Sequence, residues 1–182
     1  MKILLSQLLI LCMTLGLRAQ DIQMTRTGKI SFHAGSSLED IDATNNEVAS
    51  ALNTKTGELA FTVLVKSFHF RRALMEEHFN EIYLQSNKFP RCTFSGRVIN
   101  VATLNLSKEG EYPANVEGDL TIHGVTRKIS TPGTIRVSQG KVSAITKFRI
   151  LPGDYNISIP GVVANKFAND VEVNVECLYE PR

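Results

Sequence analysis

Residues 111–122 read Glu-Tyr-Pro-Ala-Asn-Val-Glu-Gly-Asp-Leu-Thr-Ile, and this stretch decides the fold class. From Tyr112 to Ile122 every second residue is apolar or small, whereas most residues between them are charged or polar. Successive side chains of a β-strand point to opposite faces of the sheet. The alternation therefore predicts a strand with one dry face and one wet face.

The same period of two recurs along most of the chain. It predicts further strands at 29–34, within 57–70, at 92–98, within 125–130 ahead of Pro132, at 135–137, at 142–150 and at 171–179. Gln139-Gly140 predicts a hairpin turn between two of them. Many antiparallel strands that each have one dry face must pack as a sandwich or close into a barrel.

The period changes once, between Arg71 and about Gln85. The spacing of the apolar residues predicts one amphipathic helix at about 71–85. Its apolar face carries Met75, Phe79, Ile82 and Tyr83, and its polar face carries Glu76, Glu77, Asn80 and Glu81. Pro90 follows soon after and favours extended chain.

Residues 1–19 have the layout of a secretory signal peptide. Lys2 precedes an apolar run from Ile3 to Leu17, and the small residue Ala19 stands at a plausible cleavage position. The run is too short to span a membrane comfortably, and no stop-transfer pattern follows it. We therefore expect residues 20–182 to form a single mature domain in the periplasm or the extracellular space.

The charge of the mature chain argues against binding to nucleic acid. Removing the signal peptide takes away Lys2 and Arg18, so 18 basic residues face 18 acidic ones. Without a basic field or a run of one sign, nucleic-acid binding has no electrostatic support. No other stretch is long and apolar enough to cross a membrane. The sequence leaves open whether the chain forms a homodimer.

Two cysteines remain in the mature chain, Cys92 and Cys177. In an oxidising compartment they can form a disulfide, and they can equally be two buried apolar residues. The sequence does not give the Cα separation that decides between these alternatives.

No catalytic or metal-binding motif stands out. The mature chain has four histidines, His33, His69, His78 and His123, and no pair of them has the spacing of a metal site. The strand pattern places His33 and His123 on the wet face. Nucleophile-elbow, P-loop and dinucleotide-binding motifs are not found. We expect no catalytic residues, no metal and no cofactor.

Several segments together resemble the YceI-like family, whose members are secreted lipocalin-like domains that bind polyisoprenoid lipids. The matching segments are Phe61–Phe68, Met75–Phe79, Lys88–Gly96, Gly118–Arg127 and Asp154–Pro160. They follow one another along the chain in the same order as in the family. The resemblance implies a mainly all-β fold, an antiparallel lipocalin-like β-barrel of about eight strands beside one helix. It also implies an apolar tunnel that holds an isoprenoid chain or a quinone tail. The amino end departs from the family pattern, because this chain has no Trp.

The inward faces of the predicted strands offer candidate lipid-lining residues. These are Phe61, Val63, Val65, Phe94, Val116, Leu120 and Phe148, which alternate with small residues that leave room. An isoprenoid tail needs such a lining and no placed charge. The hypothesis predicts a continuous apolar cavity longer than about 15 Å.

Two alternatives remain at this stage. One is a secreted structural or interaction domain whose interior is filled by Phe61, Phe94 and Phe148. The other is an enzyme acting on a quinone or isoprenoid, with His78, Arg127 or Tyr155 at the mouth of the cavity.

Overall fold

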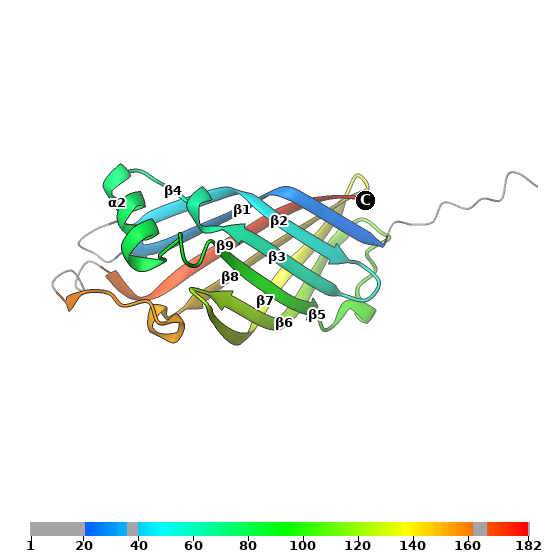
Figure 1. Cartoon of the computed structure of the whole chain (residues 1–182). Coiled ribbons are helices and arrows are strands. Elements are labelled where there is room, and N and C mark those ends of the chain that lie inside the picture. The colour runs from blue at the N-terminus through cyan, green and yellow to red at the C-terminus, as the bar shows by residue number, and fades with distance from the viewer. Residues whose placement is uncertain (1–20, 36–39, 162–166, 182) are drawn as a thin grey trace, which may run out of the picture.

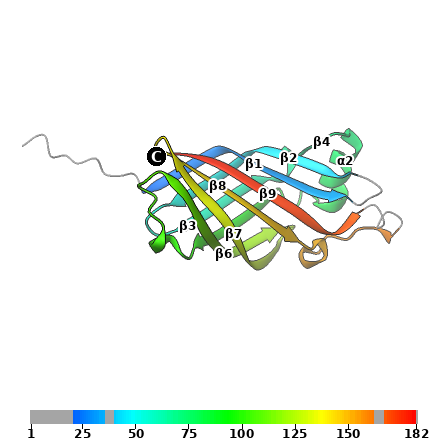
Figure 2. The ribbon, with the colours of Figure 1, turned by 180° about the vertical axis from the view of Figure 1, so that it is seen from behind.

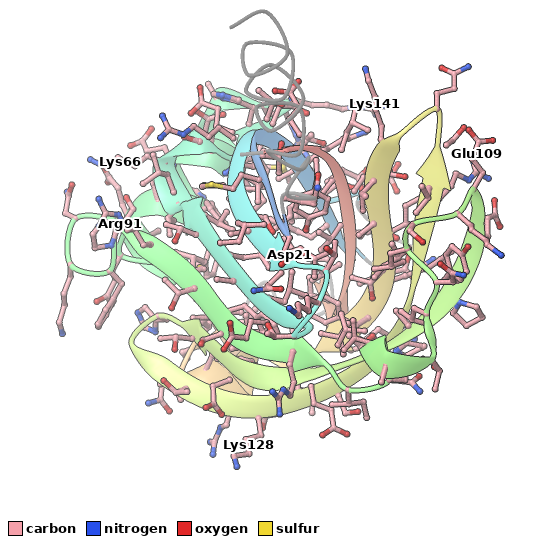
Figure 3. The ribbon with its side chains drawn as sticks, turned by 90° about the vertical axis from the view of Figure 1, so that its right-hand side faces the viewer. Asp21, Lys66, Arg91, Glu109, Lys128 and Lys141 are labelled. Carbon is pink, nitrogen blue, oxygen red and sulfur yellow. The ribbon has the colours of Figure 1, made fainter. Side chains whose placement is uncertain are left out.

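The strands form a closed barrel. The computed structural model describes residues 21–35, 40–161 and 167–181. The strands are β1 (Ile22–Gly35), β2 (Asp42–Asn53), β3 (Glu58–Leu64), β4 (His69–Phe70), β5 (Arg91–Val98), β6 (Gly110–Ile122), β7 (Val125–Ser138), β8 (Lys141–Ile150) and β9 (Phe167–Pro181). Their order is β1-β9-β8-β7-β6-β5-β3-β2, with β4 beside β2, and β1 also pairs with β2. That pairing closes the expected eight-stranded antiparallel barrel, seen end-on in Figure 3.

Short helices lie at the two ends of the barrel. They are η1 (Val65–Ser67), α2 (Ala73–His78), η2 (Phe79–Tyr83), η3 (Val101–Thr103) and η4 (Pro152–Tyr155). In Figures 1 and 2, α2 lies at one end of the molecule and the β7–β8 turn lies at the other, near the C-terminus. We call the first the helix end and the second the far end. Residues 1–20, which carry the predicted signal peptide, lie outside the described residues.

The predicted helix is confirmed, with a local difference. η2 is a π-helix, in which the N–H of Leu84 donates to the carbonyl oxygen of Phe79 at 2.8 Å. A π turn holds more residues than an α turn and so changes the angle between successive side chains. Ile82 is 51% exposed as a result, so its predicted place on the buried face was wrong.

The strand β2 was not predicted. Its buried residues are Ala43 and Asn45, and then Val48, Ser50 and Leu52, so the alternation slips by one residue between Asn45 and Val48. The register against β1 shifts at the same place, which marks a β-bulge. A bulge and two inward polar residues together hide the period of two.

The predicted run 57–70 is divided by a turn. β3 ends at Leu64, and the N–H of Val65 donates to the carbonyl oxygen of Pro90 at 3.0 Å. The turn η1 then redirects the chain, so that Phe70 pairs with Ala43 of β2. The prediction that Val65 continues the inward face of one strand was therefore wrong.

β7 continues through Pro132, where the sequence predicted an end. Opposite Pro132 lies Asn115 of β6, whose N–H donates to Oδ1 of Asn100 and whose carbonyl oxygen accepts from Ile99. Asn115 thus directs its backbone groups toward β5, and the β6–β7 ladder needs no donor from Pro132. The β7–β8 ladder does end here, because its last paired residues are Gly133 and Thr146.

Two tight turns join the strands β6 to β7 and β7 to β8. His123 and Gly124 have φ of 50° and 75°, and Gln139 and Gly140 have φ of 52° and 73°. Two positive φ values in a two-residue loop define a type I′ turn, whose twist matches that of the flanking strands. The hairpin turn predicted at Gln139-Gly140 is confirmed.

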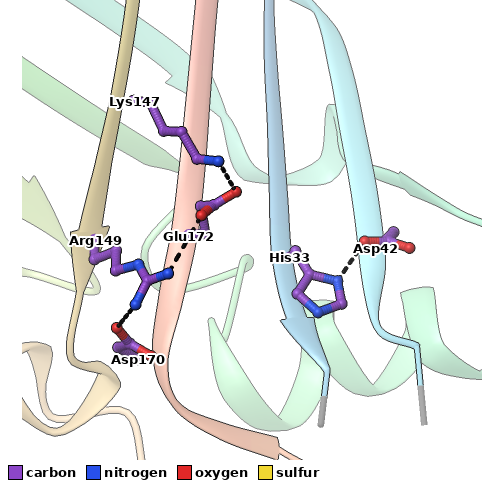
Figure 4. A network of polar contacts seen from close by, with 6 residues as sticks. All are labelled: His33, Asp42, Lys147, Arg149, Asp170 and Glu172. Atoms are coloured by element: carbon purple, nitrogen blue, oxygen red, sulfur yellow. Dashed lines mark hydrogen bonds and ion pairs between the residues drawn. The ribbon is translucent and has the colours of Figure 1, made fainter. Parts of the chain in front are cut away.

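The outer face of the barrel carries cross-strand ion pairs (Figure 4). Arg149 of β8 lies 3.0 Å from Asp170 and 3.5 Å from Glu172, both of β9, and Lys147 lies 2.5 Å from Glu172. The hydrogen bond from Lys147 and the charges of Lys147 and Arg149 lower the pKa of Glu172. His33 lies on the wet face, as predicted, with Nδ1 2.7 Å from Asp42. Exposed pairs of this kind contribute little to stability.

Candidate functional site

The barrel encloses an apolar cavity of about 510 Å³. Residues from all eight barrel strands and from α2 and η2 line it. On β9 the lining runs from Val171 to Tyr179, a distance of about 26 Å along the strand and about 20 Å along the barrel axis.

Six of the seven predicted lipid-lining residues line this cavity. They come from β3, β5, β6 and β8, and are Phe61, Val63, Phe94, Val116, Leu120 and Phe148. Val65 is 1% exposed but lies in η1 and is not part of the lining. The contact of these residues with a lipid stays a prediction.

The phenylalanines leave the centre of the barrel open because a pair of glycines makes room for one of them. Gly96 of β5 pairs directly with Gly118 of β6. A Cβ at either position would lie 2.6 Å from Cζ of Phe94, so the Phe94 ring rests against the bare backbone of this pair. Phe61 meets Phe94 edge-on, with ring centroids 6.2 Å apart. The rings thus lie along the wall and leave the cavity beside them.

Four further phenylalanines gather at the helix end and also line the cavity. Phe79 of η2 lies 5.6 Å from Phe32, 5.6 Å from Phe68 and 5.1 Å from Phe70, measured between ring centroids. We call Phe32, Phe68, Phe70 and Phe79 the aromatic cluster. It joins the helix to β1, to β4 and to Phe68, the residue that follows η1. The sequence showed each aromatic residue but not the turn at η1 that brings the four together.

The far end of the cavity is closed by a tyrosine. Tyr179 is fully buried, and its hydroxyl lies 2.9 Å from the hydroxyl of Ser50 across the inside of β1. Burial raises the pKa of Tyr179. Gly28 of β1 lies between these strands, and a Cβ there would lie 2.8 Å from Sγ of Cys177. A side chain at position 28 would therefore occupy space that the closure uses.

Cys92 and Cys177, the two cysteines among the described residues, are free thiols. Cys177 is buried, whereas Cys92 lines the cavity near the helix end. Burial raises the pKa of Cys92 to about 12 and that of Cys177 to about 11. The sequence left open a disulfide or two apolar residues, and the structure shows the second alternative, with both thiols protonated.

The basic side chains of the lining lie at the helix end. They are Arg72, next to α2, and His78, within it, and both are exposed. Of the three residues considered for an enzyme, only His78 lines the cavity. Tyr155 is 2% exposed outside the lining, and Nε of Arg127 donates to the carbonyl oxygen of Asp154 at 3.0 Å. The structure does not bring these three side chains together at the cavity.

His123 does not point to the wet face, so that prediction was wrong. Its ring meets the ring of Phe89 at a centroid distance of 4.5 Å, and its Nδ1 lies 3.2 Å from the carbonyl oxygen of Tyr155. The positive φ of the β6–β7 turn directs the ring toward these neighbours. Among the described residues, no group of three His, Cys, Asp or Glu side chains is arranged to hold a metal ion.

A closed barrel of eight antiparallel strands around a long apolar cavity is the architecture of small ligand-holding β-barrels. The model of the YceI-like domain family matches residues 21–178, and the chain belongs to this family. No curated protein matches the chain. Within the described ranges, no helix is long and apolar enough to cross a membrane.

Solved structures share the fold. A polyisoprenoid binding domain from Saccharophagus degradans, implicated in plant cell wall breakdown, is 15% identical with a TM-score of 0.77, over 90% of this chain and 99% of that chain. BcnA of Burkholderia cenocepacia is 16% identical with a TM-score of 0.70, over 84% and 96%. The YCEI protein of Campylobacter jejuni is 17% identical with a TM-score of 0.60, over 81% and 87%. At these identities the likeness concerns the fold.

Proposed function

We propose that this protein binds an isoprenoid-type lipid, a polyisoprenoid or a quinone tail, inside its barrel and stores or transports it outside the cytoplasm. The observation that carries the proposal is the cavity of about 510 Å³, which is lined mainly by apolar side chains and extends about 20 Å along the barrel axis. The fold shared with a polyisoprenoid binding domain supports it.

The hydrophobic effect supplies the binding energy. Burial of apolar surface contributes about 25 cal/mol per Å², and a chain enclosed on all sides buries most of its surface. The lining needs no buried charge to hold such a ligand. Arg72 and His78 lie at the exposed helix end, where a polar head group of the lipid would remain in water.

The same geometry favours a binding protein over a domain with a filled core. Phe61 and Phe94 touch each other at the wall, and the cavity remains beside them. It also favours binding over catalysis, because of the three candidates His78, Arg127 and Tyr155 only His78 lines the cavity. The proposed location rests on residues 1–19, and mass spectrometry of the mature protein from its natural host tests it by locating the amino terminus.

Organic extraction of the purified protein, followed by mass spectrometry, tests the proposal directly. We expect a prenyl lipid to be extracted from the protein or to be taken up when it is offered. Protein that neither carries nor takes up any prenyl lipid would contradict the proposal.

A pair of variants separates binding in the cavity from adhesion to the surface. Ala144→Phe places a ring in the cavity, and we expect it to weaken lipid binding at least about tenfold, since each buried methylene displaced costs about 0.8 kcal/mol. Ala60→Phe adds the same ring on the outer face of β3, where Ala60 is exposed, and should leave binding unchanged. Equal effects of the two variants would place the lipid outside the barrel.

A further inference from the structure

The rim of the cavity at the helix end carries exposed aliphatic side chains. Leu74 of α2 lines the cavity and is nevertheless 60% exposed. Ile82 of η2 is 51% exposed and lies outside the lining. His78, which stands four residues from each of them in the sequence, also lines the cavity. Residues four apart are neighbours along one side of a helix, and we call Leu74, His78 and Ile82 the rim row.

The π turn of η2 brings the two ends of this row closer to one side of the helix. In a continuous α-helix, residues eight positions apart differ by about 80° around the axis. A π turn holds more residues than an α turn, so each residue of η2 advances by a smaller angle and Ile82 comes nearer to the side of Leu74. The irregularity that removes Ile82 from the packed face thus places it on the rim.

A second segment at the same end also presents apolar side chains. Figures 1 and 2 show the chain that follows η4 at the helix end, near α2. Ile157 and Ile159 of this segment line the cavity and are half-buried, and Leu151, just before η4, is 49% exposed. The apolar surface of the cavity therefore continues onto the outside of the molecule at this end.

The charges around the rim row balance. Between positions 71 and 83 the exposed charged side chains are Arg71, Arg72, Glu77 and Glu81, two of each sign. A surface of balanced charge exerts little long-range attraction on a charged partner. This end offers a partner aliphatic surface, and hydrocarbon is the partner that takes up aliphatic side chains without needing placed charges or hydrogen bonds.

The cargo proposed for the cavity has the same preference. A prenyl lipid dissolves in the hydrocarbon of a bilayer and scarcely in water. Each methylene-sized group that must enter water slows the transfer about fourfold, so ten such groups slow it about a millionfold. A mouth that touches the bilayer avoids this step, because the tail then moves from one apolar environment directly into the next.

We infer that the rim row docks on the surface of a lipid bilayer, with Leu74 and Ile82 inserted among the lipids, and that the prenyl chain passes between bilayer and cavity at this contact. The docking rests on the proposed function, because it concerns the exchange of the lipid that the cavity holds. Two partly exposed side chains give a weak and transient contact. Its signature is therefore the rate of lipid exchange and not stable binding to membranes.

Exchange kinetics test the docking. Geranylgeraniol with a nitrobenzoxadiazole fluorophore on its hydroxyl end is loaded into the protein and mixed with phosphatidylcholine vesicles that contain a rhodamine-labelled lipid as quencher. We expect the transfer rate to rise in proportion to the vesicle concentration, because each transfer needs a collision. A rate that does not depend on the vesicle concentration would show release into water before uptake, and would overturn the inference.

Variants of Ile82 locate the contact. Because Ile82 does not line the cavity, Ile82→Glu and Ile82→Lys should leave the equilibrium affinity for the probe unchanged. Both should slow transfer about tenfold, since a charge of either sign resists insertion among the lipids. Ile99→Glu, at a 49% exposed position that directly follows β5 toward the far end, should change neither the affinity nor the rate.

The outcomes separate the docking from the proposed function. If the probe binds, and the Ile82 variants transfer it at the wild-type rate or Ile99→Glu slows transfer equally, docking by the rim row is wrong and lipid binding stands. If the loaded protein transfers the probe to no vesicle, the docking is also wrong and the rim row faces a protein acceptor. If the probe does not bind at all, the proposed function fails and the docking fails with it.

Discussion

Gly118→Ala tests the physical basis of the open cavity. The added Cβ would lie 2.5 Å from Cα of Gly96 and 2.6 Å from both the carbonyl oxygen of Ser95 and Cζ of Phe94. Two of these three atoms are backbone atoms of the neighbouring strand, which cannot rotate away as a side chain can. Overpacking of a well-packed interior costs about 1–3 kcal/mol, and we expect a loss of 2–3 kcal/mol here, in the upper part of that range.

The change should appear in both unfolding and binding. For a chain of this size, about 2–3 kcal/mol corresponds to a fall in Tm of roughly 4–12 °C. Phe94 must also move toward the cavity, so the affinity for a prenyl chain should fall. Gly153→Ala is the matched control, since nothing lies within 4 Å of a Cβ at that position. Chemical unfolding of both variants gives the comparison, and a Gly118→Ala protein within about 0.5 kcal/mol of the wild type would refute the argument.

Three other substitutions have defined outcomes. Tyr179→Phe leaves the buried Ser50 hydroxyl without its partner and should lower the free energy of unfolding by about 1–3 kcal/mol, measured by chemical unfolding. The double variant Tyr179→Phe with Ser50→Ala should recover part of this stability, because no buried hydroxyl is then left unpaired. A double variant as unstable as Tyr179→Phe would contradict the role of the hydrogen bond. Cys92→Val should reduce the loss of stability at alkaline pH. Burial raises the pKa of Cys92 from 9.0 to about 12, so the contribution of the protonated thiol to stability is complete below about pH 9 and is lost as the pH rises toward 12. Between pH 8 and 10 the free energy of unfolding of the wild type should therefore fall by about 1 kcal/mol more than that of the variant, and equal falls would contradict this. Phe79→Ala removes the central ring of the aromatic cluster and should lower the free energy of unfolding by about 3–5 kcal/mol if the cluster fixes the helix on the barrel. Amide hydrogen exchange should then become faster in residues 73–83 than in β5. Unchanged exchange in residues 73–83 would show that other contacts hold the helix.

The sequence correctly predicts inward-facing residues in strands where apolar and polar residues alternate without interruption. The alternation along β5, β6 and β8 places Phe94, Val116, Leu120 and Phe148 on the inward face, because successive side chains of a strand point to opposite faces and only one face is apolar. The pairing of Gly96 with Gly118 requires the register between two strands, which a period within one strand does not contain.

The sequence predicts poorly where tertiary contacts override the local pattern. In β2 a bulge and the inward polar residues Asn45 and Ser50 break the period, and the sheet supplies their partners from elsewhere in the chain. Val65 continues the pattern of β3 in sequence but turns away in space. The sequence predicts that a strand ends ahead of Pro132, whereas in the structure Pro132 ends only the pairing of β7 with β8.

The closure of the far end by Tyr179 makes the two ends of the barrel unequal. A lipid that approaches from that side meets a fully buried phenol ring held by Ser50, whereas α2 and its exposed neighbours lie at the other end. The two ends therefore differ, and for the proposed lipid we predict entry at the helix end with the tail first. In that orientation we expect the head group of the lipid to lie next to Arg72 and His78.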